Sequence, residues 1–302
     1  MIDFKKVNID DKNVFERYYK SYDPDVSEMT FTNVFMWREA YGYKYTIKND
    51  LLCCVALSSY IKPFALTPIG NCDDESFINS VLELKNYFEE KDFKLIFKRV
   101  SKRGVQKFKR LFGENQIDVE FNRDHSDYVY SIEALSTLKG KKYHKKRNHI
   151  NKFMKLYGDS YEYVKLEGKY LDDCYKILED WCDKRNCEDH NVYGCEKLAN
   201  IEVLSNLHEL NCKGALIKVN GKFEAVTVAE KLSNDTIVIH IEKANSDIDG
   251  IYTLINRDFL ANEWLEYKYV NREQDLGIEG LRKAKSSYNP DIMVDKYTVT
   301  IL

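Results

Sequence analysis

Two stretches of this 302-residue chain are rich in cations and contain no acidic residue. Residues 98–110 hold seven Lys or Arg, and residues 139–155 hold eight. The whole chain is nearly neutral, with 46 Lys and Arg against 49 Asp and Glu, so its charge is segregated along the sequence. Segregation of this kind indicates a positive surface that meets an anionic partner, although solvated helix faces would give the same pattern.

The second basic run has the spacing of an amphipathic helix. One stripe of that helix would carry Tyr143, Arg147, Ile150, Met154 and Tyr157, and another would carry Lys142, Lys145, His149 and Lys152. Arg147 is then a cation on the face that packs inward. Its head could reach back to solvent along its stem, or it could point into an interior cleft and bind an anion.

The elements that would position these residues occur twice in the same order. The N-terminal half predicts helices, a three-stranded meander, and then helix, strand, helix and strand, at 12–20, 31–41, 43–47, 51–57, 64–67, 75–90, 93–97, 102–112 and 117–121. The C-terminal half predicts the same order, with an added strand at 161–166, at 141–157, 169–186, 196–210, 214–219, 223–231, 236–242, from 250, 267–271, 278–286 and 293–302. Asn220-Gly221 is a strong signal for a two-residue hairpin. We therefore expect an α+β protein of two similar domains, residues 1–125 and 126–302.

The composition limits where the protein acts. No segment approaches the roughly 18 apolar residues that span a bilayer, and the polar N-terminus predicts no secretory signal. The eight cysteines are then expected to be reduced thiols, and the protein is expected to be cytoplasmic.

The element order resembles that of GNAT-type acyltransferase domains, arranged in tandem. Three segments carry a narrower resemblance: the basic helix at 140–153, the segment from His240 to Asn256, and the segment from Asn271 to Pro290. Together they are similar to the family of the C-terminal domain of phosphatidylglycerol lysyltransferase, and more distantly to the Fem peptidoglycan aminoacyltransferases.

The resemblance implies transfer of an aminoacyl group from an aminoacyl-tRNA to an acceptor that it does not identify. The basic helix at 139–155 would face the tRNA, with Lys142, Lys145, Lys146 and Arg147 as binding residues. Lys285 would lie at the active site, and His240 and Glu242 would line the aminoacyl pocket. No cofactor other than the aminoacyl-tRNA donor is implied.

The chemistry of such a transfer passes through a tetrahedral oxyanion, which needs a nearby donor or positive charge. Lys285 could supply it, with Arg272 and Arg282 close in sequence, whereas Lys283 cannot share its helix face. Glu242 or Asp275 could take a proton or hold an ammonium group, although Asp275 also fits a turn residue before Gly277. Tyr252, Asn256 and Tyr288 could line the cleft or pack in the core.

Two other functions stay open. An acetyl-CoA-dependent N-acetyltransferase would need a glycine-rich phosphate loop, but residues 244–250 contain one Gly and two Asp. A non-catalytic, metal-stabilised binding module could use Cys182, Cys187, His190 and Cys195, but their spacing is irregular and we expect no metal. A Cys–His nucleophilic pair is also open, with no pair favoured by the sequence.

Overall fold

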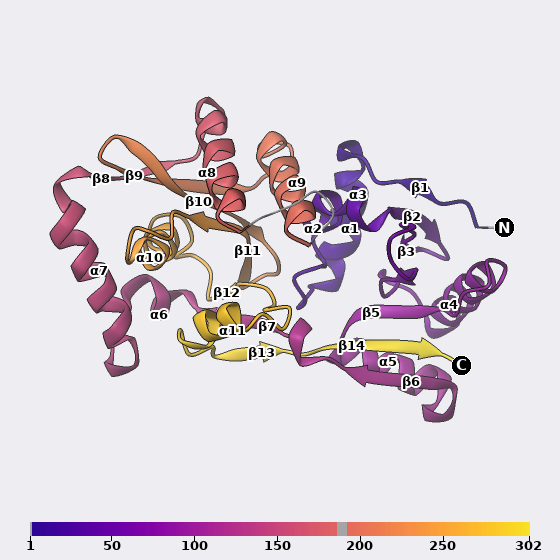
Figure 1. The fold of residues 1–302 in the computed structure, drawn as a ribbon. Helices are drawn as coiled ribbons and strands as arrows, with labels where there is room; N and C mark the ends of the chain where they lie inside the picture. Colours follow the sequence, from indigo (N-terminus) through magenta and orange to yellow (C-terminus); the bar gives the residue numbers. More distant parts are fainter. Residues whose placement is uncertain (1, 186–191) are drawn as a thin grey trace. The chain divides into compact units, whose positions relative to one another are not determined.

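The computed structural model describes residues 2–185 and 192–302 and contains two compact units, each with its own sheet (Figure 1). By its internal contacts the first unit comprises the residues up to Asp127 together with 274–279 and 293–302. The second unit comprises residues 128–273 and 280–292. Helices and strands mix in both units, so the predicted α+β class is confirmed.

The first sheet has seven strands in the order β1-β2-β3-β4-β5-β14-β6. Their bounds are β1 Lys5–Lys6, β2 Tyr43–Lys48, β3 Leu51–Ala56, β4 Phe64–Ala65, β5 Ile96–Ser101, β14 Lys296–Ile301 and β6 Ile117–Phe121. The helices of this unit are α1 Lys12–Tyr22, α2 Phe31–Met36, α3 Arg38–Tyr41, α4 Asp74–Glu89 and α5 Lys102–Phe112. Phe77, Phe97 and Phe108 are fully buried in the core that α4 and α5 form with this sheet.

The second sheet has the order β8-β9-β10-β11-β12-β7-β13. Its strands are β8 Tyr161–Lys165, β9 Lys213–Val219, β10 Lys222–Lys231, β11 Thr236–Ala244, β12 Tyr269–Asn271, β7 Asp127–Ser131 and β13 Ile292–Val294. The helices are α6 Ile132–Thr137, α7 His144–Tyr157, α8 Leu171–Asp183, α9 Val192–Ser205, α10 Ile251–Glu263 and α11 Glu279–Ser286.

The two sheets share one pattern of pairing. In each, a run of antiparallel neighbours is followed by one parallel pair, β4 with β5 in the first sheet and β11 with β12 in the second. Each then continues with an antiparallel strand from a distant part of the sequence, β14 beside β5 and β7 beside β12. The repeated element order thus corresponds to a repeated sheet topology.

The strand expected at 293–302 is instead two strands. Residues 292–294 form β13 of the second sheet, whereas 296–301 form β14 of the first sheet. Asp295 separates them and accepts a hydrogen bond from the Ser126 hydroxyl at 3.1 Å. A continuous apolar-rich run does not reveal that its two ends pair with different neighbours.

Local sequence explains the hairpins. Asn220 and Gly221 both have positive φ (51° and 81°), and Val219 pairs with Lys222, so the predicted two-residue hairpin is confirmed. Asn49 and Asp50 turn the β2–β3 hairpin in the same way, with φ of 49° and 58°. Turns with two positive φ values match the twist of antiparallel strands, which is why Asn, Asp and Gly occupy them.

The parallel pair of the second sheet is short. Only Thr236 to Val238 pair with Tyr269 to Asn271, and β11 then continues alone to Ala244. The strands therefore part beyond these residues. Because neighbouring strand residues face opposite sides of a sheet, Glu242 meets α10 on one side and Lys243 meets α8 on the other.

Candidate functional site

Two side-chain pairs bridge the strands of the second unit where they part. The Arg272 Nη2 atom donates to Glu242 Oε1 at 2.5 Å, and His240 Nδ1 lies 3.0 Å from Glu273 Oε1. His240 and Glu242 belong to β11, and the other two residues follow the end of β12. These four side chains occupy the gap that the diverging strands would otherwise leave.

Five expected site residues gather on the α10 side of this gap and form what we call the buried centre: Lys146, Glu242, Asn256, Arg272 and Tyr288. Asn256 Nδ2 donates to Glu242 Oε2 at 3.0 Å. The Arg272 guanidinium lies 4.8 Å from the centre of the Tyr288 ring, and the Lys146 ammonium lies 3.6 Å from it. Cations over a tyrosine face are attracted by the ring quadrupole, so the ring holds both cations near one carboxylate.

Arg272 carries a hydrogen-bond donor that no described residue satisfies. The Arg272 and Glu242 side chains are only 11% and 12% exposed, and Arg272 Nη1 is buried without a partner. Burial by itself lowers the pKa of Arg272, but Glu242 and the neighbouring tyrosines raise it overall, so the guanidinium stays charged. An unsatisfied buried donor costs about 1–3 kcal/mol. This cost is recovered when a ligand supplies an acceptor oxygen.

Lys146 reaches the buried centre from α7. Burial lowers the pKa of Lys146 to about 8, the Arg272 charge lowers it further in the same direction, and Glu242 opposes both. Ile150 and Phe153 are buried on the same face of α7. The inward stripe therefore runs through Lys146 and Phe153, whereas the sequence pattern favoured Arg147 and Met154, and Met154 is 40% exposed.

Arg147 has a different role in this structure. Its Nη1 atom donates to the carbonyl oxygens of Leu138 and Gly140, at 2.5 and 2.7 Å. Leu138 follows α6 with a positive φ of 50°, so Arg147 satisfies carbonyl groups at the end of that helix, a common use of cations there. The guanidinium binds backbone in this structure and does not enter the buried centre.

His240 is enclosed between two carboxylates. Its side chain is 0% exposed, with Nε2 2.8 Å from Glu230 Oε1 and Nδ1 3.0 Å from Glu273 Oε1. Burial alone lowers the pKa of His240, but the hydrogen bonds to the two carboxylates raise it to about 9. His240 is thus an imidazolium ion at neutral pH, and both its nitrogens are engaged.

Lys285 holds the backbone beside the buried centre. Its Nζ atom donates to the carbonyl oxygens of Arg272 and Glu273, at 2.6 and 3.1 Å. The Tyr130 hydroxyl in turn donates to the carbonyl oxygen of Lys285 at 2.8 Å. Lys285 therefore ties α11 to the segment that carries Arg272, next to the site where the sequence placed it.

The other expected residues lie outside the buried centre. The Tyr252 hydroxyl donates to the Ala244 carbonyl at 3.1 Å, and Arg282 is partly exposed on α11. Lys142 and Lys145 are exposed on α7 and the turn before it. Asp275 belongs to the first unit, where it accepts from the Gly277 backbone N–H at 2.9 Å, as expected of a turn residue.

The structure adds four residues that the sequence did not single out. Glu230 and Glu273 enclose His240, Tyr130 contacts Arg272 with its ring, and the Tyr288 hydroxyl donates to Thr253 Oγ1 at 3.3 Å. Glu273 and Thr253 lie inside segments already noted, so their neighbours were the available signal. Glu230 and Tyr130 lie on β10 and β7, and nothing in their local sequence distinguishes them from core strand residues.

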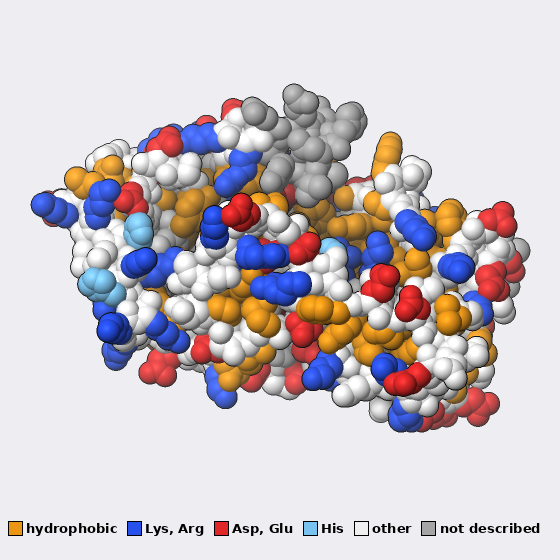
Figure 2. Space-filling view, turned by 60° about the horizontal axis from the view of Figure 1, so that its bottom comes forward, with side chains coloured by type: hydrophobic (Ala, Val, Ile, Leu, Met, Phe, Trp, Pro, Cys, Tyr) orange, Lys and Arg blue, Asp and Glu red, His pale blue; other side chains and the backbone are white. Residues whose placement is uncertain are grey.

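The two basic runs differ in their partners. In the first run the cations are mostly neutralised, as in the pairs Arg99–Glu28, Arg103–Asp25, Lys109–Glu114 and Arg110–Asp74. In the second run, Lys152 pairs with Asp249. No ion pair to a residue that the structure describes is found for Lys139, Lys141, Lys142, Lys145 or Lys155. Figure 2 shows blue Lys and Arg side chains gathered at the left, where α7 lies in Figure 1.

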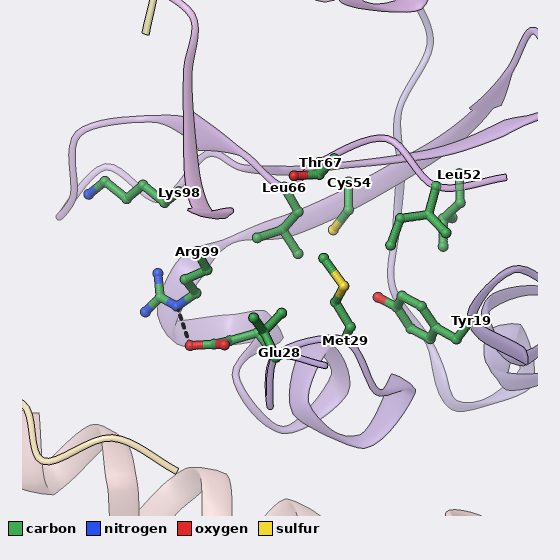
Figure 3. Close-up of a pocket in the computed structure, with 11 residues that line it drawn as sticks. Tyr19, Glu28, Met29, Leu52, Cys54, Leu66, Thr67, Lys98 and Arg99 are labelled. Atoms are coloured by element: carbon green, nitrogen blue, oxygen red, sulfur yellow. Dashed lines mark hydrogen bonds and ion pairs between the residues drawn. The ribbon is translucent and has the colours of Figure 1, made fainter. Parts of the chain in front are cut away.

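Each unit also contains a hollow. In the first unit, a narrow one lies between Leu66 and Cys54 above and Met29 below, with the Arg99–Glu28 ion pair at one end (Figure 3). It leaves room for little more than a water molecule. In the second unit, an open hollow of about 460 Å³ lies where the end of α8 meets the end of β11. Its lining includes Asp180, Trp181, Lys184, Arg185, Glu224 and Asn245.

The part of the chain that the structure describes holds no group of three or more His, Cys, Asp or Glu side chains suited to a metal ion. Cys182 is buried on α8. The other members of the metal set considered from the sequence, Cys187, His190 and Cys195, lie outside the residues whose side chains are described. None of the described helices is long and apolar enough to cross a membrane.

Relatives and solved structures share this architecture. A structure from Bacteroides thetaiotaomicron, of a conserved protein of unknown function, is 31% identical, with full coverage of both chains and a TM-score of 0.93. L-PGS from Bacillus licheniformis is 13% identical, with a TM-score of 0.69 and coverage of 100% of this chain and 94% of that one. FemX is 8% identical, with a TM-score of 0.61 and coverage of 100% and 98%.

A curated relative, an uncharacterized protein of Mycoplasmoides gallisepticum, is 24% identical over 191 residues, which are 63% of this chain and 61% of the relative. The chain thus matches less than two thirds of that relative's length. The structural likenesses confirm the expected tandem GNAT-like fold, which Fem transferases share. The family model for the C-terminal part of phosphatidylglycerol lysyltransferase matches residues 19–300. Because this match spans nearly the whole chain, the protein belongs to the phosphatidylglycerol lysyltransferase C-terminal family.

Proposed function

We propose that this protein is an aminoacyltransferase that moves an aminoacyl group from an aminoacyl-tRNA to an acceptor, with its reaction centre in the second unit. Family membership and fold fit such a transferase. The donor is proposed from the charge of α7 and from the chemistry of the buried centre, and the acceptor is left unspecified.

One observation carries the proposal: α7 presents cations on two sides. Its exposed side and the preceding turn carry lysines that have no acidic partner among the described residues, including Lys141, Lys142 and Lys145. Its inner side sends Lys146 into the buried centre. A polyanion bound along α7 would therefore place one end close to Arg272, as tRNA must if its aminoacylated 3′ end is to react.

The buried centre fits the steps of acyl transfer. The acceptor's nucleophilic atom attacks the ester carbonyl carbon, and the carbonyl oxygen becomes an oxyanion. Arg272 Nη1, which has no partner, is a donor available for that oxygen. Lys146, with its pKa near 8, can take the proton that the acceptor loses and return it to the departing ribose oxygen as the ester C–O bond breaks.

Acetyl-CoA is disfavoured as a donor by the loop that precedes α10. In that loop Asp247 pairs with Lys184, and Asp249 pairs with Lys152 and His149. Carboxylates at a helix N-terminus compete with a pyrophosphate for the same backbone donors. Acetyl-CoA is therefore the comparison donor in the experiment.

The test is to incubate the protein with tRNAs carrying labelled amino acids, or with labelled acetyl-CoA, in the presence of a bacterial lipid and cell-wall precursor extract as acceptor. Transfer of label from one or more aminoacyl-tRNAs to the extract, with loss abolished in Arg272→Met, supports the proposal. Transfer only from acetyl-CoA, or from neither donor, contradicts it.

A binding measurement tests the α7 surface separately. Affinity for tRNA should fall steeply with salt, and the combined substitution of Lys139, Lys141, Lys142 and Lys145 by Ala should lower the salt slope by up to about 0.7–0.9 per lost phosphate contact. The matched control substitutes Lys102, Lys107, Lys109 and Arg110 of α5 by Ala. An equal effect of both sets would remove α7 as the specific tRNA surface.

A further inference from the structure

The transferred group must find partners inside the second unit, and these partners limit its chemistry. A cationic side chain, such as that of lysine or arginine, needs a carboxylate with free acceptor positions if it is to be buried. Without one, burial of its charge costs several kcal/mol. The carboxylates around the buried centre therefore decide whether such a side chain is accepted.

The carboxylate of the buried centre is already engaged. Glu242 accepts from Arg272 through Oε1 and from Asn256 through Oε2. Its other charged neighbours are cationic, because Arg272 stays charged and Lys146 is mostly protonated at pH 7. An ammonium group placed here would meet two positive charges and one carboxylate that both cations share.

The nearby carboxylates behind this position are engaged as well. Glu230 and Glu273 both contact His240, which is an imidazolium ion at neutral pH. Releasing either carboxylate for a ligand would leave a buried imidazolium short of a partner. The His240 group therefore offers no place for a second cation.

The hollow at the end of α8 has the same character. It contains two carboxylates, Asp180 and Glu224, and Lys222 lies 3.4 and 3.7 Å from them. Glu224 also accepts from Asn245 Nδ2 at 2.9 Å. Because Lys184 and Arg185 add positive charge to the lining, this hollow does not favour a cationic side chain either.

The group without a partner in the buried centre is a donor. Arg272 Nη1 asks for an acceptor oxygen, which an ester carbonyl or an uncharged polar side chain provides. We infer that the aminoacyl group accepted by this site has an uncharged side chain, and that lysyl and arginyl groups are rejected. The α-amino group is common to all aminoacyl esters and does not discriminate. This inference rests on the proposed function and adds the class of its substrate.

The first test compares donors and bound analogues at pH 7. Non-hydrolysable adenosine analogues that carry alanine or lysine in amide linkage at the 3′ position are titrated against the protein. We expect the alanyl analogue to bind at least tenfold more tightly than the lysyl analogue. Equal or tighter binding of the lysyl analogue, or no binding of either, overturns the inference.

A charge-changing variant tests the cause. Asn256→Asp adds a carboxylate beside Glu242 with little change in shape, so the alanyl-to-lysyl preference should fall at least tenfold. Asn262→Asp, on the exposed side of the same helix, is the matched control and should keep the wild-type preference. If Asn256→Asp folds, as circular dichroism checks, and keeps the wild-type preference, the charge argument is wrong.

The outcomes separate this inference from the proposed function. If the alanyl analogue binds preferentially but no aminoacyl-tRNA donates its label, the proposed function fails and the preference of the site stands. If aminoacyl-tRNAs donate and lysyl-tRNA or arginyl-tRNA is the fastest donor, the proposed function stands and this inference fails.

Discussion

The ammonium of Lys285 holds the backbone of Arg272: Nζ donates to the Arg272 carbonyl oxygen at 2.6 Å and to the next carbonyl at 3.1 Å. The Arg272 guanidinium is at the same time fixed by Glu242 and by the Tyr288 ring. The two cations are thus linked through the main chain, and Lys285 sets where the free Arg272 donor points.

Replacing Lys285 by Met should therefore impair catalysis by displacing Arg272. We expect kcat to fall by about tenfold or more, because small displacements of a catalytic donor have large effects on rate. The free energy of unfolding should fall by about 1–3 kcal/mol from the lost hydrogen bonds of a charged donor. Lys283→Met, two positions away and exposed, is the control. An unchanged kcat in Lys285→Met would remove Lys285 from the mechanism.

The enclosed His240 predicts a loss of stability in alkali. The pKa of His240 is about 9 in the folded chain, against 6.5 for an ordinary histidine. Because the folded value is the higher one, its stabilisation is complete below pH 6.5 and is lost as the pH rises through 9. The size of the loss is about 3 kcal/mol.

Urea unfolding at pH 6 and pH 9.5 measures this loss. His240→Gln keeps one hydrogen-bond donor but does not titrate, so its free energy of unfolding should change less between the two pH values than that of the wild type. A wild-type stability that is flat across this window would show that Glu230 and Glu273 do not hold a proton on His240.

The sequence predicts the fold better than it predicts the contacts of the buried centre. Hairpin turns such as Asn220-Gly221 are local signals, and the repeated element order reflects periodicity over short windows. In α7, however, steps of three and four residues back from Ile150 reach both Arg147 and Lys146, so the periodicity does not separate them. The carbonyls of Leu138 and Gly140 decide the matter by binding Arg147.

Long-range pairing explains the other differences. His240 was expected to line a pocket, and the structure encloses it because Glu230 and Glu273 approach from 10 and 33 residues away. A register shift between Val228 and Ala229, on the strand opposite, accompanies this arrangement. The division of the last strand at Asp295 likewise depends on two separate sheets. Local sequence carries no signal for either contact.

Gly250 fixes the start of α10 against α7. Its φ is +88°, and a Cβ atom there would lie 2.5 Å from the His149 carbonyl oxygen. Gly250→Ala should therefore destabilise the chain by more than about 1–2 kcal/mol, the cost of the left-handed backbone alone, because the added contact is with main chain. Thermal unfolding measures the effect. Gly168→Ala, where a Cβ meets nothing within 4 Å, is the control, and an equal change in both variants would contradict the close approach of α7 and α10.

Lys146 predicts the pH dependence of transfer. Burial and the Arg272 charge lower its pKa to about 8, so the neutral amine that accepts a proton forms as the pH rises through 8. The rate of transfer under single-turnover conditions should rise over pH 7–9 and then level. Lys146→Met should lower the rate and abolish this rise, since no other change in the buried centre supplies a titrating amine in that range.

Lys145→Met provides the comparison, because Lys145 is exposed on the same helix. Its loss should weaken tRNA binding while leaving the rise at pH 8 in place. Lys146→Arg separates charge from proton transfer: it keeps a cation near Tyr288 but does not deprotonate below pH 12, so it should bind tRNA normally and lack the rise. A Lys146→Arg variant with the wild-type pH profile would show that Lys146 acts only through its charge, and proton transfer would then be assigned to another group.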